Sequence, residues 1–92
     1  MLEIKWKDVD PDTGQRRYLC AERFARVWRF RWKLVRRGEW NRWLEPTRAM
    51  WEHVLDSLKR RYTRREGVED ADIDQVAKIL AAIVRDEELR KG

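Results

Sequence analysis

The sequence predicts a single α+β domain spanning residues 1–92, in which an antiparallel sheet of three to four strands precedes two helices packed on one face of the sheet. Three observations predict this fold. Charged and apolar side chains alternate in two segments of the first half, a Pro- and Gly-containing turn separates two candidate strands, and apolar residues recur at helical spacing in the second half. The expected strands cover residues 2–9, 15–21, 27–36 and 39–43, and the expected helices cover residues 47–65 and 72–89.

The first two strands are predicted by a hairpin pattern. Apolar and charged residues alternate over 2–7, which is the period of a strand with one buried face. Asp-Pro-Asp-Thr-Gly at 10–14 then combines a fixed φ, side-chain acceptors and a residue that tolerates positive φ. In the return strand, Tyr18 and Cys20 lie on one face, and Arg17 and Leu19 lie on the other. Which of these two faces is buried stays open.

The clearest alternation runs through residues 28–34, where an aromatic or aliphatic side chain alternates with a cation. As a strand, this segment carries its apolar side chains on one face and Arg29, Arg31 and Lys33 on the other. The alternative is a helix over 20–37, which gives an N-terminal hairpin plus three helices, because polar residues also recur at spacings of three and four. We favour the strand, since a helix would place Arg31 among apolar side chains.

A two-residue turn at Arg37-Gly38 would lead into the fourth strand. In that register Lys33 faces Arg42 and Trp32 faces Trp43, so that both tryptophans point into the core while Trp40 lies on the basic face. One bulged residue at Gly38 would instead turn Trp40 toward the apolar face. The sequence leaves these two positions of Trp40 open.

The two helices have recognisable ends. Pro46 and Thr47 open the first, and Gly67 lies just past its basic end. The second begins near Asp72, which with Gln75 forms a capping-box-like start. Apolar residues recur at three and four along both helices, at Trp51, Val54, Leu55, Leu58 and Tyr62, and at Ile73, Val76, Ala77, Leu80, Ile83 and Val84.

Charge is distributed unevenly along the chain, whose net charge is +5. Residues 1–14 carry two basic and four acidic side chains, residues 15–65 carry 16 and five, and residues 66–92 carry four and eight. The net charges of the three segments are therefore −2, +11 and −4. A basic centre between acidic ends points to a polyanionic partner or to pairing between the ends and the centre.

Several classes of function have little support in the composition. One His, one Cys and one Ser offer no nucleophile beside an oriented base, so we expect no enzyme; His53 and Cys20 are expected to be structural and to hold no metal, and no cofactor is expected. The longest apolar run, residues 79–84, is far shorter than the roughly 20 residues that span a membrane. With one cysteine and no signal-like N-terminus, the expected location is the cytoplasm. No small-molecule substrate is indicated.

The remaining expectation is a domain that acts by binding, with nucleic acid contacted through its phosphate backbone ranked ahead of an acidic protein. The alternative is a protein-interaction or structural module, with a homodimer as one form, because Trp and Arg are also enriched at protein interfaces. The expected contact residues are Arg29, Arg31, Lys33, Trp40 and Arg42. A second basic patch comprises Lys59, Arg60, Arg61, Arg64 and Arg65, although neighbouring acids offer it partners.

Overall fold

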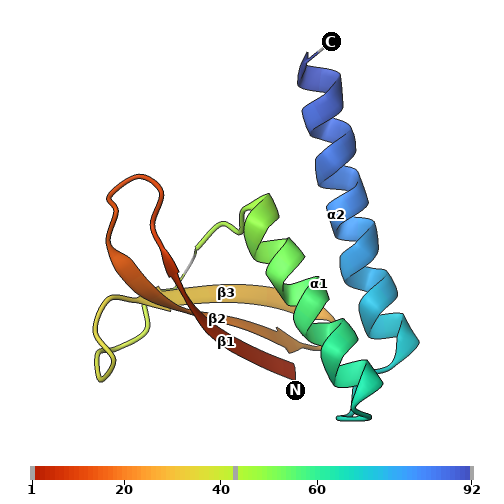
Figure 1. The fold of residues 1–92 in the computed structure, drawn as a ribbon, viewed down its shortest axis with the longest axis horizontal. Helices are drawn as coiled ribbons and strands as arrows, with labels where there is room; N and C mark the ends of the chain where they lie inside the picture. Colours follow the sequence, from red (N-terminus) through yellow and green to blue (C-terminus); the bar gives the residue numbers. More distant parts are fainter. Residues whose placement is uncertain (1, 43, 92) are drawn as a thin grey trace. The chain divides into compact units, whose positions relative to one another are not determined.

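The computed structural model describes residues 2–42 and 44–91 and confirms the α+β fold. Three strands precede two helices along the chain (Figure 1). They are β1 (Leu2–Val9), β2 (Arg16–Phe24), β3 (Val27–Lys33), α1 (Arg48–Thr63) and α2 (Asp70–Lys91). The chain divides into two compact units, which we call the sheet unit (Met1–Glu45) and the helical unit (Pro46–Gly92).

The sheet is antiparallel with the strand order β1-β2-β3. The strand interpretation of residues 27–33 is therefore confirmed, and the alternative of a helix over 20–37 is wrong. β2 lies in the centre, and its residues 18–23 have a partner on both sides. Leu19 pairs with Trp6 and Trp32, and Tyr18 pairs with Lys7 and Lys33. Directly opposed residues point to the same face, so these pairs define the two faces of the sheet.

One face of the sheet, which we call the apolar face, carries the side chains of the sheet unit's core. Ile4, Leu19, Ala21 and Phe30 are all buried on it. The rings of Trp6 and Phe30 meet edge to face, with centroids 6.4 Å apart and an interplanar angle of 88°. Burying each of the large side chains Ile4, Leu19 and Phe30 contributes roughly 1.5–3 kcal/mol relative to leaving it exposed.

The β1–β2 turn is closed by a short set of hydrogen bonds. The Asp10 amide donates to the Gln15 carbonyl at 2.8 Å, and the Gly14 amide donates to the Asp10 carbonyl at 2.8 Å. Gly14 has a φ of 72°, which favours a residue without Cβ. The Asp10 carboxylate accepts from the Asp12 amide at 2.9 Å, and this bond is the main cause of a lowered Asp10 pKa.

A nearly buried ion pair between Arg17 of β2 and Asp8 of β1 stabilises the same hairpin. Arg17 Nε donates to Asp8 Oδ1 at 2.7 Å and Arg17 Nη2 donates to Asp8 Oδ2 at 3.1 Å, the fork geometry that guanidinium and carboxylate groups prefer. Asp10 lies 3.6 Å away as a second partner. Only 8% of the Arg17 side chain is exposed, so its charge depends on these partners.

The β2–β3 connection is a two-residue turn at Ala25-Arg26. Both residues have positive φ, 51° and 64°, as the mirror-image turns of hairpins require. Asn and Gly usually occupy such positions because a Cβ is strained there, and neither is present here. The turn is therefore set by the pairing of its flanking strands and carries local strain.

The third reversal differs from the expected one. The Gly38 amide donates to the Val35 carbonyl at 2.9 Å, so the turn is centred on Arg36-Arg37 and not on Arg37-Gly38. Trp32 consequently pairs with Asn41 and not with Trp43, through hydrogen bonds of 3.1 and 2.7 Å. This pairing is an isolated bridge, so the described part of residues 39–43 does not continue the sheet as a strand; Trp43 lies outside the described residues.

Both helices of the helical unit are capped at their N-termini. Thr47 precedes α1, as expected, and its hydroxyl accepts from the Met50 amide at 3.3 Å. α2 begins at Asp70, two residues before the expected start. Asp72 accepts from the Glu69 amide at 2.9 Å, so it caps the helix from inside the first turn and is not its first residue.

The two helices form an antiparallel pair (Figure 1). Near the open end of the pair, Arg48 at the start of α1 binds Glu87 near the end of α2 at 2.8 Å. The loop that joins the helices contains two positive φ values, 59° at Arg65 and 80° at Gly67. The buried side chains are Met50, Trp51, Val54 and Leu58 of α1 and Asp72, Val76 and Leu80 of α2.

Ala25→Asn should stabilise the protein by about 0.5–1 kcal/mol, because Asn tolerates the left-handed conformation better than Ala. Urea unfolding followed by tryptophan fluorescence measures the change. Ala82→Asn, the same substitution at an exposed position inside α2, should destabilise instead, because Asn is the poorer helix former. A loss of stability in Ala25→Asn would contradict the strained turn.

Asp8→Ala should destabilise the protein by about 3 kcal/mol, because it leaves the nearly buried Arg17 charge without its main partner. The matched control is Glu3→Ala, which breaks the exposed Lys5–Glu3 pair and should cost under about 1 kcal/mol. Urea midpoints of the two variants and the wild type provide the comparison. Equal losses in both variants would show that the Arg17–Asp8 pair does not hold the hairpin.

Candidate functional site

The net charge of the protein resides in the sheet unit. Residues 1–45 carry 12 Lys or Arg and seven Asp or Glu, a net charge of +5, whereas residues 46–92 carry ten of each and are neutral. The acidic C-terminal third therefore balances basic residues of its own unit. A site for an anionic partner is best sought on the sheet unit.

Most of the cations of the sheet lie on the face opposite the apolar face, which we call the basic face. The register places six cations there and only two carboxylates, Glu3 and Glu22. The six are Lys5, Lys7, Arg16, Arg29, Arg31 and Lys33. Cys20 also lies on this face, between Lys5 and Arg31, and is fully buried; its burial raises the pKa of its thiol.

Four residues of the basic face form a line across the sheet in which cations and aromatic rings alternate. We call Lys7, Tyr18, Lys33 and Trp40 the cross-strand row. Lys7 Nζ lies 5.4 Å from the centroid of the Tyr18 ring, and Lys33 Nζ lies 5.9 Å from it. The same Lys33 Nζ lies 4.4 Å from the centroid of the Trp40 ring. Each contact is within the range of a cation–π interaction, and both rings are only half-buried.

Arg31 is engaged by its neighbours. Its Nη2 donates to Glu22 Oε2 at 2.7 Å, and its guanidinium lies 5.8 Å from the centroid of the Trp40 ring. Its Nε is buried without a hydrogen-bond partner in the structure. Only a quarter of the side chain is exposed. Arg31 therefore supports Trp40 from within the sheet face and offers little of its charge to solvent.

The other sequence-predicted residues of the sheet unit lie around the row. Arg29 is exposed and is paired in register with Glu22, whose carboxylate binds Arg31 instead. Arg42 is exposed and directly follows Asn41, the residue bridged to Trp32. The structure thus brings Arg31, Lys33 and Trp40 into contact, and leaves Arg29 and Arg42 as exposed cations at the periphery.

Lys7, Arg16 and Tyr18 also belong to this surface, although they were not among the contact residues predicted from the sequence. The signal was present in two separate parts, the alternation over residues 2–7 and the turn at 10–14. Joining them requires the pairing of Asp10 with Gln15, because only this register aligns Lys7 with Tyr18. Turn residues alone do not fix the number of residues in a loop.

A hollow of about 380 Å³ lies beside Tyr18 at one end of the row. Val9 and Leu34 line it with apolar surface, and Lys7 and Arg16 line it with positive charge. Arg17 also borders the hollow but is already paired with Asp8. This volume is at the small end of the range for ligand pockets, about 300–1,000 Å³.

The second basic patch lies at the C-terminal end of α1 and in the loop after it. Arg60 forms an ion pair with Asp56 one turn earlier in the same helix. The other four cations, Lys59, Arg61, Arg64 and Arg65, form no ion pair within the parts of the chain that the structure describes. The Tyr62 hydroxyl forms a hydrogen bond with Asp70, and this bond raises the pKa of Tyr62. Cations at a helix C-terminus also complement the helix dipole.

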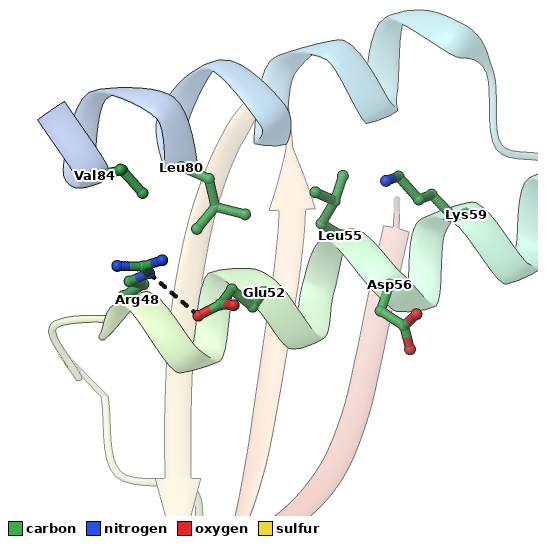
Figure 2. A pocket seen from close by; sticks show the side chains of 7 residues that line it. All are labelled: Arg48, Glu52, Leu55, Asp56, Lys59, Leu80 and Val84. Carbon is green, nitrogen blue, oxygen red and sulfur yellow. Dashed lines mark ion pairs between the residues drawn. The ribbon is translucent and has the colours of Figure 1, made fainter.

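A groove of about 320 Å³ lies between the two helices (Figure 2). Leu55 of α1 and Leu80 and Val84 of α2 line it with apolar surface. Its charges are compensated at one end, where Arg48 binds Glu52 at 3.4 Å and Glu87 at 2.8 Å. At the other end Lys59 lines the groove without an ion pair to any described residue, and Asp56 binds Arg60. The groove therefore combines a short apolar strip with charges that are mostly paired.

A metal site within the described residues, 2–42 and 44–91, would require several ligand side chains close together. No cluster of three His, Cys, Asp or Glu side chains there has the geometry to hold a metal ion. His53 is half-buried in α1, and its burial lowers its pKa. Across the same residues, no helix is both long and apolar enough to cross a membrane.

Comparison with known proteins adds no relative: no family model, no curated protein and no solved structure matches the chain. The function is therefore inferred from the geometry of the sheet unit.

His53 should make the free energy of unfolding depend on pH. Burial lowers its pKa below the ordinary 6.5, with Asp56 opposing and Arg60 adding to the shift. The unfolded chain then binds the proton more tightly, so stability is full above about pH 6.5 and falls as the pH decreases toward the folded pKa. His53→Gln should remove this decrease between about pH 7 and about pH 5 in urea unfolding followed by circular dichroism. Asp10, whose pKa is lowered from the ordinary 3.8, changes the free energy of unfolding only at pH values below this range. An unchanged pH profile in the variant would assign the effect to another group.

Proposed function

We propose that this protein acts by binding nucleic acid, without catalysis, through contacts between the basic face and the phosphate backbone. The observation that carries the proposal is the cross-strand row, in which Lys7 and Lys33 alternate with Tyr18 and Trp40 on one surface. Phosphate neutralisation requires several cations on one surface, and base contacts require aromatic rings among them. The row supplies both kinds of group.

The affinity would come mainly from the exposed cations of the basic face. Lys5, Lys7, Arg16 and Arg29 are exposed, and none of them is held in a buried ion pair. Each phosphate neutralised by one of them releases bound counterions, so the logarithm of the binding constant falls with the logarithm of salt concentration. Arg31 would contribute little to this term because Glu22 already binds it.

An acidic protein is the competing partner. Surface cations attract both kinds of polyanion, so charge alone does not separate them. The spacing of the rings favours nucleic acid, because Lys33 lies between Tyr18 and Trp40 and places a cation between two stacking surfaces. A polynucleotide repeats the same order, with a phosphate between successive bases.

The test is a binding titration of the whole protein with fluorescently labelled RNA and DNA at several salt concentrations. Lys7→Gln should lower the slope of log K against log salt by about 0.7–0.9, the contribution of one phosphate contact. The matched control is Lys78→Gln, which removes an exposed lysine from the neutral helical unit and should leave the slope unchanged.

Two results would contradict the proposal. The first is no binding to any nucleic acid at low salt. The second is equal slopes for the wild type and Lys7→Gln, with a reduced slope for Lys78→Gln, since this would move the contact to the helical unit. Tight binding to polyglutamate without binding to nucleic acid would favour the acidic-protein partner, and size-exclusion chromatography with light scattering would then test for a homodimer.

A further inference from the structure

Tyr18 and Trp40 are half-buried residues of the basic face, and each ring lies against cationic side chains. A base can stack on such a ring only when one of its own faces is free. In a duplex both faces of a base are covered by its neighbours, and freeing one requires extrusion of the nucleotide. We propose, building on the nucleic-acid binding proposed above, that the ligand is single-stranded and that Tyr18 and Trp40 each stack one of its bases.

The spacing of the two rings fits an extended strand. Lys33 Nζ lies 5.9 Å from the Tyr18 centroid and 4.4 Å from the Trp40 centroid, so the two centroids are at most about 10 Å apart. The separation itself follows from the register: Tyr18 pairs with Lys33 on one side of β3, and the Trp32–Asn41 bridge places Trp40 on the other side, at two strand spacings of about 4.8 Å each from Tyr18. Successive bases of one strand in B-form DNA lie about 3.4 Å apart along the helix axis. Bases that occupy both rings are therefore splayed apart, as bases in single-stranded segments are when proteins bind them.

Lys33 connects the two stacking positions. Its ammonium group contacts both rings and donates a hydrogen bond to the Arg36 carbonyl at 2.7 Å, which holds it between them. A phosphate that links the two stacked bases would lie at this ammonium group. The exposed Lys7 is free to leave the Tyr18 ring when a base stacks there, because its cation–π contact is exchanged for a stronger charge-assisted bond to phosphate.

The hollow beside Tyr18 provides a place for the first base. Its apolar lining by Val9 and Leu34 suits the faces of a flat aromatic ring, and the lining cations Lys7 and Arg16 suit the flanking phosphates. The lining carboxylate of Asp8 is neutralised by its ion pair with Arg17. The hollow belongs to the sheet unit alone, so the site is complete within that unit. Tyr18, which lines the hollow, has a lysine next to its ring on each neighbouring strand, Lys7 on β1 and Lys33 on β3.

The first measurement compares ligands on the wild-type protein and requires no variant. Fluorescence anisotropy is recorded with a uridine or thymidine oligonucleotide of about 16 nucleotides and with a duplex of the same length. The single strand should bind at least about five-fold more tightly at equal salt. Equal or tighter binding of the duplex would overturn the inference while leaving the proposed phosphate contacts intact.

The second measurement separates stacking from charge. Tyr18→Leu and Trp40→Leu should each weaken single-strand binding by about five-fold or more with an unchanged salt slope, because the phosphate contacts remain. Tyr18→Phe and Trp40→Phe keep a ring and should retain most of the affinity. The circular dichroism spectra of the two leucine variants should match that of the wild type, which excludes unfolding as the cause. The matched control is Tyr62→Leu, the same change at an exposed tyrosine of the helical unit.

The results distinguish the two proposals. No binding to any nucleic acid would reject nucleic-acid binding altogether. Salt-dependent binding that is unaffected by Tyr18→Leu and Trp40→Leu would reject base stacking alone. A loss of affinity in Tyr62→Leu without a loss in the two row variants would place the stacking site at the second basic patch and would also overturn the inference.

Discussion

The register of β2 against its two neighbours is the constraint on which the candidate site depends. A shift of one residue in a strand exchanges its two faces, so a slip of β2 would place Tyr18 on the apolar face and Leu19 among the cations. The register is fixed by the turn at Asp10–Gln15, which aligns β1, and by the two-residue turn at Ala25-Arg26, which aligns β3. The buried Arg17–Asp8 pair reinforces the first of these alignments. The cross-strand row is therefore a consequence of turn geometry together with core packing.

The sequence predicted on which face of the sheet a side chain lies more reliably than it predicted which residue on the next strand it pairs with. Alternation over residues 28–34 correctly separated Trp28, Phe30 and Trp32 from the cations, because period two is a local property of the chain. The expected turn at Arg37-Gly38 was wrong, since the reversal is centred on Arg36-Arg37. The error shifted the pairing of Trp32 by two residues, from 43 to 41, and an even shift preserves the face. Trp40 consequently lies beside Lys33 on the basic face, which is one of the two positions that the sequence left open.

The environment of each cation could not be predicted from the sequence. Arg29 and Arg31 occupy equivalent positions in the alternation, yet one is exposed and the other is three-quarters buried with an unpartnered Nε. The difference arises because Glu22, directly opposite Arg29, reaches diagonally to Arg31. On a sheet face, a carboxylate on a long side chain can reach either the residue directly opposite or the diagonal one. Sequence therefore identifies which cations share a surface, but the ion pairs that decide which of them face solvent depend on three-dimensional packing.

The division of charge between the two units sharpens the meaning of the basic centre of the sequence. Its +11 segment crosses the boundary at residues 45 and 46, so part of this charge belongs to a helical unit whose acids balance it. The unbalanced charge lies on the sheet unit, where the strand register concentrates it on one face. A field of this kind raises the rate of encounter with any polyanion but does not select among them. In the proposed function, selection would come from groups that act at short range, namely the rings of Tyr18 and Trp40, which contact Lys7, Arg31 and Lys33. Charge would therefore bring the ligand to the face, and the aromatic rings would determine its class.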